Sequence, residues 1–162
     1  MKKIFVVLLL LIGLANLSAA EVHKDKDMLI KCEVETAVSM LQTIYNKYEA
    51  GEMSIDKAKK LGADLLRDLR YGEDGYFWAD TTEGVNVVLF GNKDVEGKNR
   101  LEAQDHHGNF FIKDLIAAGK KGGGYVEYWF PKLKQEEPVA KRSYALLFKP
   151  FSWVVGTGYY TE

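Results

Sequence analysis

The sequence is poor in cysteine and proline and has no excess of one charge. One Cys and three Pro occur among 162 residues, and 22 basic residues nearly balance 23 acidic ones. A single thiol excludes an internal disulfide framework, and the balanced charge gives no electrostatic reason to expect nucleic acid as a partner. Cys32 is therefore expected to be a small buried side chain on a helix.

The sequence has only one long apolar run, at its N-terminus. Two lysines precede the apolar run 4–14, and small residues follow at 18–20. This order predicts a secretory signal peptide over 1–20, cleaved after Ala20, and an exported periplasmic domain over 21–162. The run is shorter than the roughly 20 apolar residues of a membrane span, and an uncleaved membrane anchor stays the alternative.

Motifs of familiar enzyme and metal chemistries are absent as well. No Ser lies in a nucleophile elbow, no His-Glu pattern of a zinc protease occurs, and Cys32 has no evident activating partner. Gly122–Gly124 lacks the spacing of a phosphate loop. His106 and His107 are adjacent, and neighbouring His side chains on a turn cannot easily reach one ion. We expect no catalytic residue, no cofactor and no metal, and a small exported enzyme is the less favoured alternative.

Two segments with helical periodicity follow the apolar run. Apolar residues recur at helical spacing from Val34 to Tyr48, which predicts one long amphipathic helix over 21–50. Ser54 is suited to cap a second helix over 54–70. The expected apolar face of this second helix consists of Ile55, Ala58, Leu61, Leu65 and Leu69.

After Gly75 the apolar period changes from that of a helix to that of a strand. The expected elements are a strand at 76–79, a turn at 80–84, a strand at 85–90, a polar connection at 91–105, a short helix at 108–118 and three further strands. These elements predict an α+β fold with five antiparallel strands. All five strands are expected after Gly75, and no strand is expected before Gly72.

The C-terminal part of the chain, 122–160, is rich in aromatic residues punctuated by glycine. Tyr and Trp on an antiparallel sheet give apolar faces that end in hydroxyl or indole donors, which suits a pocket for a small polar molecule. The aromatic candidates are Tyr76, Trp78, Tyr125, Tyr128, Trp129 and Tyr144. Because alternate strand residues face opposite ways, about half of them should pack on the long helix instead. Gly156 and Gly158 leave one strand face bare for a helix or a ligand to approach.

A carboxylate ligand taken out of water would need a cation, because an unpaired buried charge costs several kcal/mol. The candidate cations are Lys141, between aromatic segments, and Arg100, at the end of a polar loop. Lys141 would otherwise be a solvated side chain on the outer face of its strand. Arg100 would otherwise pair with Glu102 or Asp105 and hold the loop in place.

Several ordered motifs between about Val34 and Tyr160 resemble the single-Cache domains, which are PAS-like extracellular sensor modules of bacterial chemoreceptors and kinases. The motifs are Arg70-Tyr71-Gly72, Gly75-Tyr76-Phe77-Trp78, Glu96-Gly97-Lys98-Asn99-Arg100, Gly123-Gly124-Tyr125, Tyr128-Trp129-Phe130-Pro131 and Trp153-Val154-Val155-Gly156-Thr157-Gly158. The resemblance implies a long N-terminal helix on a five-stranded antiparallel sheet, with a ligand pocket between the other sheet face and residues 91–118. At Leu89-Phe90 the sequence departs from the His-Pro that many members carry, and most members continue into a membrane helix and a signalling domain.

The sequence thus predicts a periplasmic sensor module that binds a short carboxylate or a similar metabolite and feeds chemotaxis or signal transduction. The predicted ligand-binding residues are Tyr76, Trp78, Arg100, Tyr125, Trp129, Lys141 and Tyr144. A membrane receptor or kinase is the expected partner. The alternative function is a periplasmic adaptor that contacts a membrane receptor through its long helix.

Overall fold

The computed structural model of the protein describes the backbone of residues 2–161 and the side chains of residues 22–161. In chain order the elements are α1 (Lys2–Glu49), α2 (Ile55–Asp68), β1 (Arg70–Tyr71), β2 (Gly75–Tyr76), β3 (Trp78–Thr81), β4 (Asn86–Leu89), η1 (Lys93–Val95), α3 (Phe111–Lys120), β5 (Gly124–Pro131), β6 (Pro138–Phe148), η2 (Lys149–Phe151) and β7 (Trp153–Tyr160). Two helices therefore lead the chain, and the long strands follow them.

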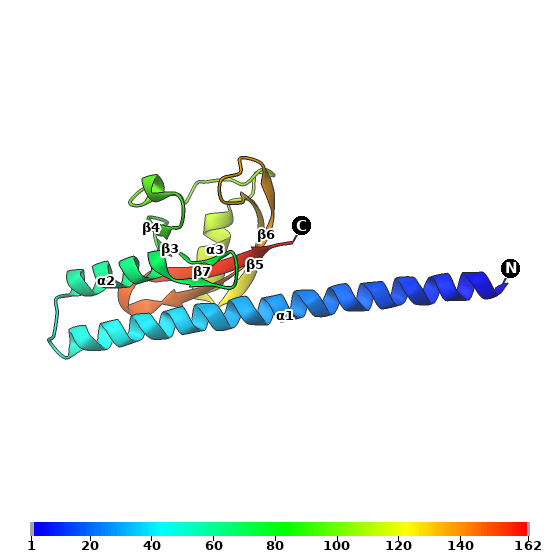
Figure 1. Ribbon diagram of the computed structural model, residues 1–162. Coiled ribbons are helices and arrows are strands. Elements are labelled where there is room, and N and C mark those ends of the chain that lie inside the picture. The colour runs from blue at the N-terminus through cyan, green and yellow to red at the C-terminus, as the bar shows by residue number, and fades with distance from the viewer. Residues whose placement is uncertain (1, 162) are drawn as a thin grey trace.

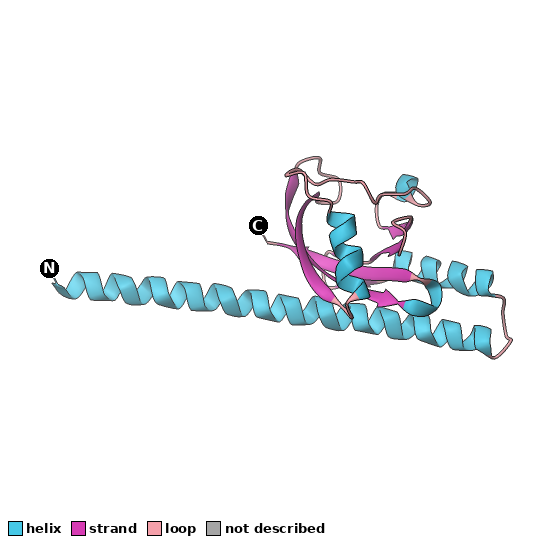
Figure 2. Ribbon diagram, turned by 180° about the vertical axis from the view of Figure 1, so that it is seen from behind, coloured by secondary structure: helices cyan, strands magenta, loops and turns pink. Residues whose placement is uncertain are grey.

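Five strands form one antiparallel sheet in the order β4-β3-β7-β6-β5. Helices α1 and α2 cover one face of the sheet, and α3 covers the other, as Figures 1 and 2 show from opposite sides. Each face buries its own apolar cluster. The predicted α+β fold, a long helix on a five-stranded antiparallel sheet, is confirmed.

Helix α1 packs on the sheet through a stripe of side chains that recur every three or four residues. These buried residues are Ile30, Val34, Ala37, Leu41 and Ile44. Burial of each larger member contributes about 1.5–3 kcal/mol to folding, which holds this half of the helix against β6 and β7.

The predicted helix 21–50 is part of α1, which continues back to Lys2 and projects beyond the sheet in Figure 1. The predicted signal peptide, 1–20, falls where side chains are outside the described residues. Over residues 22–161, whose side chains are described, no helix is both long and apolar enough to cross a bilayer.

The apolar face predicted for α2 is confirmed at Ala58, Ile55 and Leu69, which are buried or packed against the core, and is wrong at Leu61 and Leu65. The helix buries Ala58, Gly62 and Leu66, whereas Leu61 and Leu65 are 38% and 40% exposed. Gly62 causes the difference, because a Cβ at this position would lie only 2.8 Å from Cδ2 of Leu41. The absence of that side chain lets α2 turn its small residues toward α1 and the sheet.

The segment after α2 also differs from the prediction. The helix expected over 54–70 ends at Asp68, and Arg70–Tyr71 forms a strand although none was expected before Gly72. This strand pairs only with β2, so the two make a separate hairpin, and Gly72 adopts a positive φ of 54° in its turn. The strand predicted at 76–79 is divided between β2 and β3, and β3 extends into the expected turn.

Cys32 is exposed on α1, so the prediction of a buried thiol is wrong. The buried stripe passes through Ile30 and Val34, and the intervening position 32 points to the opposite side of the helix. The predicted inward packing of α3 is confirmed, since its residues Phe111, Leu115 and Ile116 are buried on the side that faces the sheet. That packing closes the sheet face on which the candidate site lies.

Candidate functional site

A small cavity lies between α3 and the sheet. Its volume is about 10 Å³, close to the space that one water molecule needs. Its lining residues are Tyr76, Trp78, Leu89, Arg100, Phe111, Ile112, Leu115, Tyr128, Phe130 and Lys141. The structure therefore brings together four of the seven predicted ligand-binding residues, namely Tyr76, Trp78, Arg100 and Lys141.

The other three predicted residues lie away from this cavity. Tyr125 faces α1, where its hydroxyl donates to the backbone oxygen of Asp27 at 2.9 Å. Tyr144 is buried in the apolar cluster that α1 forms with β5 and β6. Trp129 packs its ring against His107, with 4.8 Å between the ring centroids. Strand alternation explains why Tyr125 and Tyr144 do not line the cavity, because one face of β5 and β6 is turned toward α1 and the other toward α3.

Lys141 is the central residue of the cavity. Its side chain is only 2% exposed, and Nζ donates to the Tyr76 hydroxyl at 2.6 Å. The rings of Tyr76, Phe130 and Tyr160 surround Nζ, with centroids 4.3, 5.4 and 5.1 Å away. Among the described residues, no carboxylate pairs with this ammonium. Burial lowers the pKa of Lys141 from 10.5 to about 7.

Trp78 supplies a second buried donor to the same cavity. Its indole Nε1 is buried and has no hydrogen-bond partner among the described residues. The indole occupies the bare position at Gly156, where a Cβ would collide with it. The predicted close approach to this glycine is thus made by a neighbouring Trp. Two buried donors, Lys141 Nζ and Trp78 Nε1, line the cavity. Among the described residues only the Tyr76 hydroxyl accepts from either of them, so donor capacity remains that an anion can satisfy.

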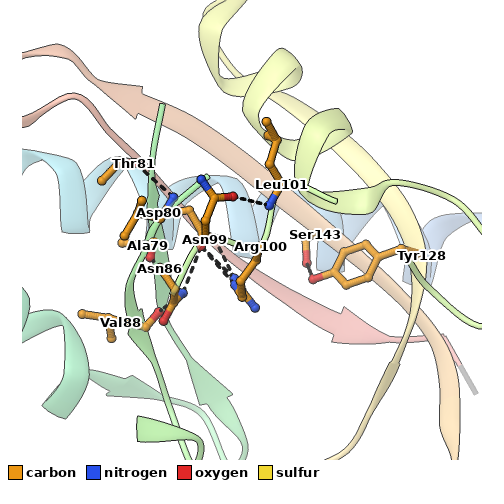
Figure 3. A network of polar contacts seen from close by, with 11 residues as sticks. Ala79, Asp80, Thr81, Asn86, Val88, Asn99, Arg100, Leu101, Tyr128 and Ser143 are labelled. Carbon is orange, nitrogen blue, oxygen red and sulfur yellow. Dashed lines mark hydrogen bonds and ion pairs between the residues drawn. The ribbon is translucent and has the colours of Figure 1, made fainter. Parts of the chain in front are cut away.

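Arg100 also lines the cavity, but its charge is already paired. Nη2 lies 2.7 Å from Oδ2 of Asp80, and both Nη2 and Nε donate to Oδ1 (Figure 3). Asp80 is 1% exposed and accepts a further bond from Asn86 Nδ2 at 3.0 Å. Neither Glu102 nor Asp105 is the partner, so that alternative is wrong. Arg100 fixes a loop to β3 and forms one wall of the cavity.

Tyr128 stands directly opposite Lys141 in the pairing of β5 with β6. Its hydroxyl lies 3.0 Å from Ser143 Oγ (Figure 3), and its ring stacks on Phe111 with centroids 4.9 Å apart. Burial raises the pKa of Tyr128 and keeps the hydroxyl neutral. From the sequence, this Tyr is an aromatic candidate that is not among the predicted ligand-binding residues. The register against Lys141 is the signal that selects it.

The remaining lining residues are not among the predicted ligand-binding residues. They are Leu89, Phe111, Ile112, Leu115 and Phe130. Most of them are apolar residues of ordinary core type, and nothing in their spacing separates a cavity wall from a filled core. They give the cavity its apolar, water-excluding character.

A five-stranded antiparallel sheet with a long helix on one face and a short helix on the other is the architecture of PAS-like sensor domains. A solved periplasmic sensor domain of a chemotaxis protein shares it with a TM-score of 0.82 at 27% identity, over 87% of this chain and 98% of that chain. The family model for single Cache domain 2 matches residues 22–162, and the chain belongs to this family.

Curated relatives are signalling proteins. The chain is 30% identical over 162 residues to the methyl-accepting chemotaxis protein McpP of Pseudomonas putida. The aligned region covers 97% of this chain and 30% of McpP. It is 34% identical over 139 residues to the sensor histidine kinase MctS of Rhizobium johnstonii. This aligned region covers 86% of this chain and 30% of MctS. The chain thus spans about a third of the length of these relatives.

A solved structure has the same fold and a described ligand class. It is reported under the description "Structural basis for carboxylic acid recognition by a Cache chemosensory domain". The TM-score is 0.83 at 30% sequence identity, and the match covers 88% of this chain and 98% of that chain. The sensor fold is therefore shared over nearly the whole described domain.

Proposed function

We propose that the domain is a sensor of a small carboxylate, which binds in the cavity beneath α3. The observation that carries this proposal is the buried ammonium of Lys141, which has no carboxylate partner among the described residues. The recognition of carboxylic acids by a Cache domain of the same fold supports this ligand class. The relatives support an output in chemotaxis or kinase signalling.

The chemistry of the cavity favours a carboxylate over a neutral ligand. A carboxylate oxygen would accept from Lys141 Nζ and Trp78 Nε1, and the charge-assisted bond to Nζ is the stronger of the two. Tyr76 holds Nζ in place through its hydroxyl. Arg100 contributes a wall and little free charge, because Asp80 pairs with it. A volume of about 10 Å³ favours the smallest monocarboxylates and requires the lining side chains to move outward on binding.

The test is a calorimetric titration of the domain with acetate. Lys141→Met should weaken acetate binding by about 2–5 kcal/mol, because the anion would be desolvated without its cation. Lys149→Met is the control, since Lys149 is exposed, and it should leave the affinity within about twofold.

The stability of Lys141→Met gives a check on its folding. The substitution removes a buried cation that has no ion-pair partner among residues 22–161, so the variant should be at least as stable as the parent protein. An acetate affinity that stays within about threefold in the folded Lys141→Met variant would show that the cavity is not the carboxylate site.

The sequence features of residues 1–20 lead us to propose that this segment directs export and that residues 21–162 act in the periplasm, with a membrane receptor or kinase as the partner. The basic start followed by a short apolar run supports the proposal. Mass spectrometry of the protein recovered from the periplasm should show an N-terminus near Glu21. Recovery of the protein with Lys2 and Lys3 retained in the membrane fraction would contradict cleavage.

A second role, as an adaptor acting through α1, is favoured by one observation. Val22, Met28 and Leu29 are 50%, 57% and 48% exposed near the middle of α1, just before the buried stripe begins at Ile30. Exposed apolar side chains that gather on one segment mark contact surfaces. A photo-crosslinking residue at Leu29 should capture a membrane receptor in cells, while one at the exposed Gln42 should not. Equal capture at both positions would remove the support for this role.

A further inference from the structure

A second and larger hollow lies beside the small cavity. It is an open groove of about 810 Å³ between α1, the β1–β2 hairpin and the loop that follows β5. Three cationic side chains line it, those of Lys26, Arg70 and Lys132, together with the acidic pair Glu73 and Asp74 of the hairpin turn. The groove thus has a small excess of positive charge, which attracts anions.

A single layer of side chains separates the groove from the cavity. Tyr76 lines both hollows, and Tyr160 lines the groove while its ring centroid lies 5.1 Å from Lys141 Nζ. Tyr160 is anchored at its far end, where its hydroxyl donates to the backbone oxygen of Pro131 at 2.8 Å. A displacement of the Tyr76 ring would therefore open the ammonium of Lys141 to the groove.

Arg70 is a cation held in a fixed position on the groove side of this layer. Its guanidinium carbon lies 3.4 Å from the centre of the Phe90 ring, and Nη1 donates to the backbone oxygens of Arg67 and Leu69 at 2.8 and 2.7 Å. Within the described part of the chain, no carboxylate forms an ion pair with Arg70. The Phe90 ring in turn packs on Tyr76, with centroids 5.7 Å apart.

These contacts order two cations along one path. Arg70 lies at the groove, Phe90 and Tyr76 follow, and Lys141 lies in the cavity. Arg70 and Tyr76 also belong to the same short hairpin, in which β1 pairs with β2 and Arg70 lies opposite Tyr76. A ligand that contacts Arg70 therefore contacts the hairpin that carries Tyr76, whose ring separates the groove from the cavity.

We propose that the groove is the path by which a small organic anion reaches Lys141, and that Arg70 is an outer binding site for its carboxylate. The proposal rests on the carboxylate function of the inner cavity. Arg70 receives the carboxylate through the two guanidinium nitrogens that the backbone oxygens leave unused. The Tyr76 ring then moves aside, and the anion passes to the buried ammonium. Binding at the exposed outer site is weak and is reduced by salt.

The outer site is tested first in the Lys141→Met variant, where the inner cation is gone. Acetate is the probe, and the Nε–Hε signal of Arg70 and the backbone amides of Gly72 and Gly75 are followed by NMR. We expect saturable shifts that shrink as the salt concentration is raised. Adding Arg70→Gln should abolish them, whereas adding Lys26→Gln should keep them. An absence of acetate-dependent shifts at Arg70 would overturn the outer site.

The path is tested by the kinetics of acetate binding in the protein with Lys141 intact. Because Arg70 does not contact the anion in the inner cavity, Arg70→Gln should slow association and dissociation by the same factor, about three- to tenfold, and leave the equilibrium affinity unchanged. Arg70→Lys should restore most of the rate, and Lys26→Gln should change it less than Arg70→Gln. An association rate that is unaltered in Arg70→Gln would overturn the path.

The two proposals fail in distinguishable ways. If acetate shifts the Arg70 signals but shows no binding that depends on Lys141, the outer site stands and the carboxylate function of the cavity is wrong. If binding depends on Lys141, but acetate does not shift the Arg70 signals and Arg70→Gln does not change the binding rates, the cavity function stands and the groove proposal is wrong.

Discussion

Lys141 and Arg142 are consecutive residues of β6, yet their charged groups lie on opposite faces of the sheet. Lys141 Nζ faces the cavity, whereas Arg142 donates from Nε and Nη2 to the two carboxylate oxygens of Asp27 on α1, at 2.7 and 2.9 Å. The Tyr159 hydroxyl donates to Asp27 as well, at 3.0 Å. Two neighbouring residues thus connect the candidate ligand site to the long helix.

The ion pair between Asp27 and Arg142 should stabilise the packing of α1 on the sheet. The Arg142 guanidinium holds the pKa of Asp27 below its ordinary value of 3.8. We expect Asp27→Asn to lower the free energy of unfolding by about 1–2 kcal/mol near neutral pH, which allows for the partial exposure of both side chains. The difference should disappear as the pH falls through the lowered pKa of Asp27, because protonation removes the same charge.

Urea unfolding at several pH values measures this effect. Glu127→Gln is the matched control, since Glu127 bonds the same guanidinium but is 69% exposed, and it should change stability by less than about 0.5 kcal/mol. Acetate affinity should be the same in both variants, because Asp27 lies on the other sheet face. A tenfold change in acetate affinity on Asp27→Asn would instead show that the two faces are coupled.

Acetate binding should depend on pH through Lys141. Burial lowers the pKa of Lys141 to about 7 in the ligand-free protein, and the anion binds the protonated ammonium, so bound acetate must raise that pKa. Affinity should therefore be constant between about pH 5, below which acetate itself becomes protonated, and about pH 7, and should fall by about tenfold per pH unit above that, until the pH reaches the raised pKa. Calorimetry across this range measures the slope, and Lys149→Met should share it. A flat profile above pH 7 would mean that the ligand does not bind to a protonated Lys141.

Breaking the pair between Arg100 and Asp80 should be much more costly than breaking an exposed pair. Arg100→Met leaves the carboxylate of Asp80, which is 1% exposed, without its cation, and we expect a loss of about 3–5 kcal/mol in unfolding free energy. Arg67→Met, which breaks the more exposed pairs with Glu96 and Asp64, should cost about 1–2 kcal/mol.

The double variant Arg100→Met with Asp80→Leu separates the cost of an unpaired charge from the loss of packing. It should recover most of the stability, since no uncompensated carboxylate remains. Chemical unfolding of the three variants gives the comparison. Equal losses for the Arg100 and Arg67 single variants would show that Asp80 has another source of compensation.

The fold could be predicted to a large extent because its signals are local. The stripe from Val34 to Ile44 recurs every three or four residues, and the change of period after Gly75 marks the start of the sheet. The face of α2 could be predicted only in part, because Gly62 is informative only once its neighbour Leu41 on another helix is known. The β1–β2 hairpin was missed for a similar reason, since its strands are only two residues long.

The site was predictable in its charge and less so in its walls. Lys141 was selected because a lysine within an aromatic sheet is unusual, and the structure places it in the cavity. Alternation along a strand indicates that two faces exist but not which one faces the ligand, so Tyr125 and Tyr144 could not be separated from Tyr128. The partner of Arg100 could not be found either, because Asp80 comes near it only through the pairing of distant segments.

Gly156 controls the space that Trp78 occupies at the edge of the cavity. The two residues are paired across β7 and β3, and a Cβ at Gly156 would collide with the Trp78 indole. The backbone of two paired strands cannot easily move apart, so Gly156→Ala should push the indole into a cavity of only about 10 Å³. We expect a loss of about 1–3 kcal/mol in unfolding free energy and a loss of acetate binding of at least about tenfold.

Two further variants show whether the indole is responsible for these losses. Val155→Ala removes volume from the other face of β7, so it should lower stability by about 0.5–3 kcal/mol without a change in acetate affinity. Gly156→Ala combined with Trp78→Phe should recover stability, because the smaller ring leaves room for the methyl group. It should not recover full acetate affinity, since the Nε1 donor is gone. Unfolding curves and acetate titrations measure both effects, and full recovery of affinity in the double variant would show that Trp78 is a wall and not a donor to the ligand.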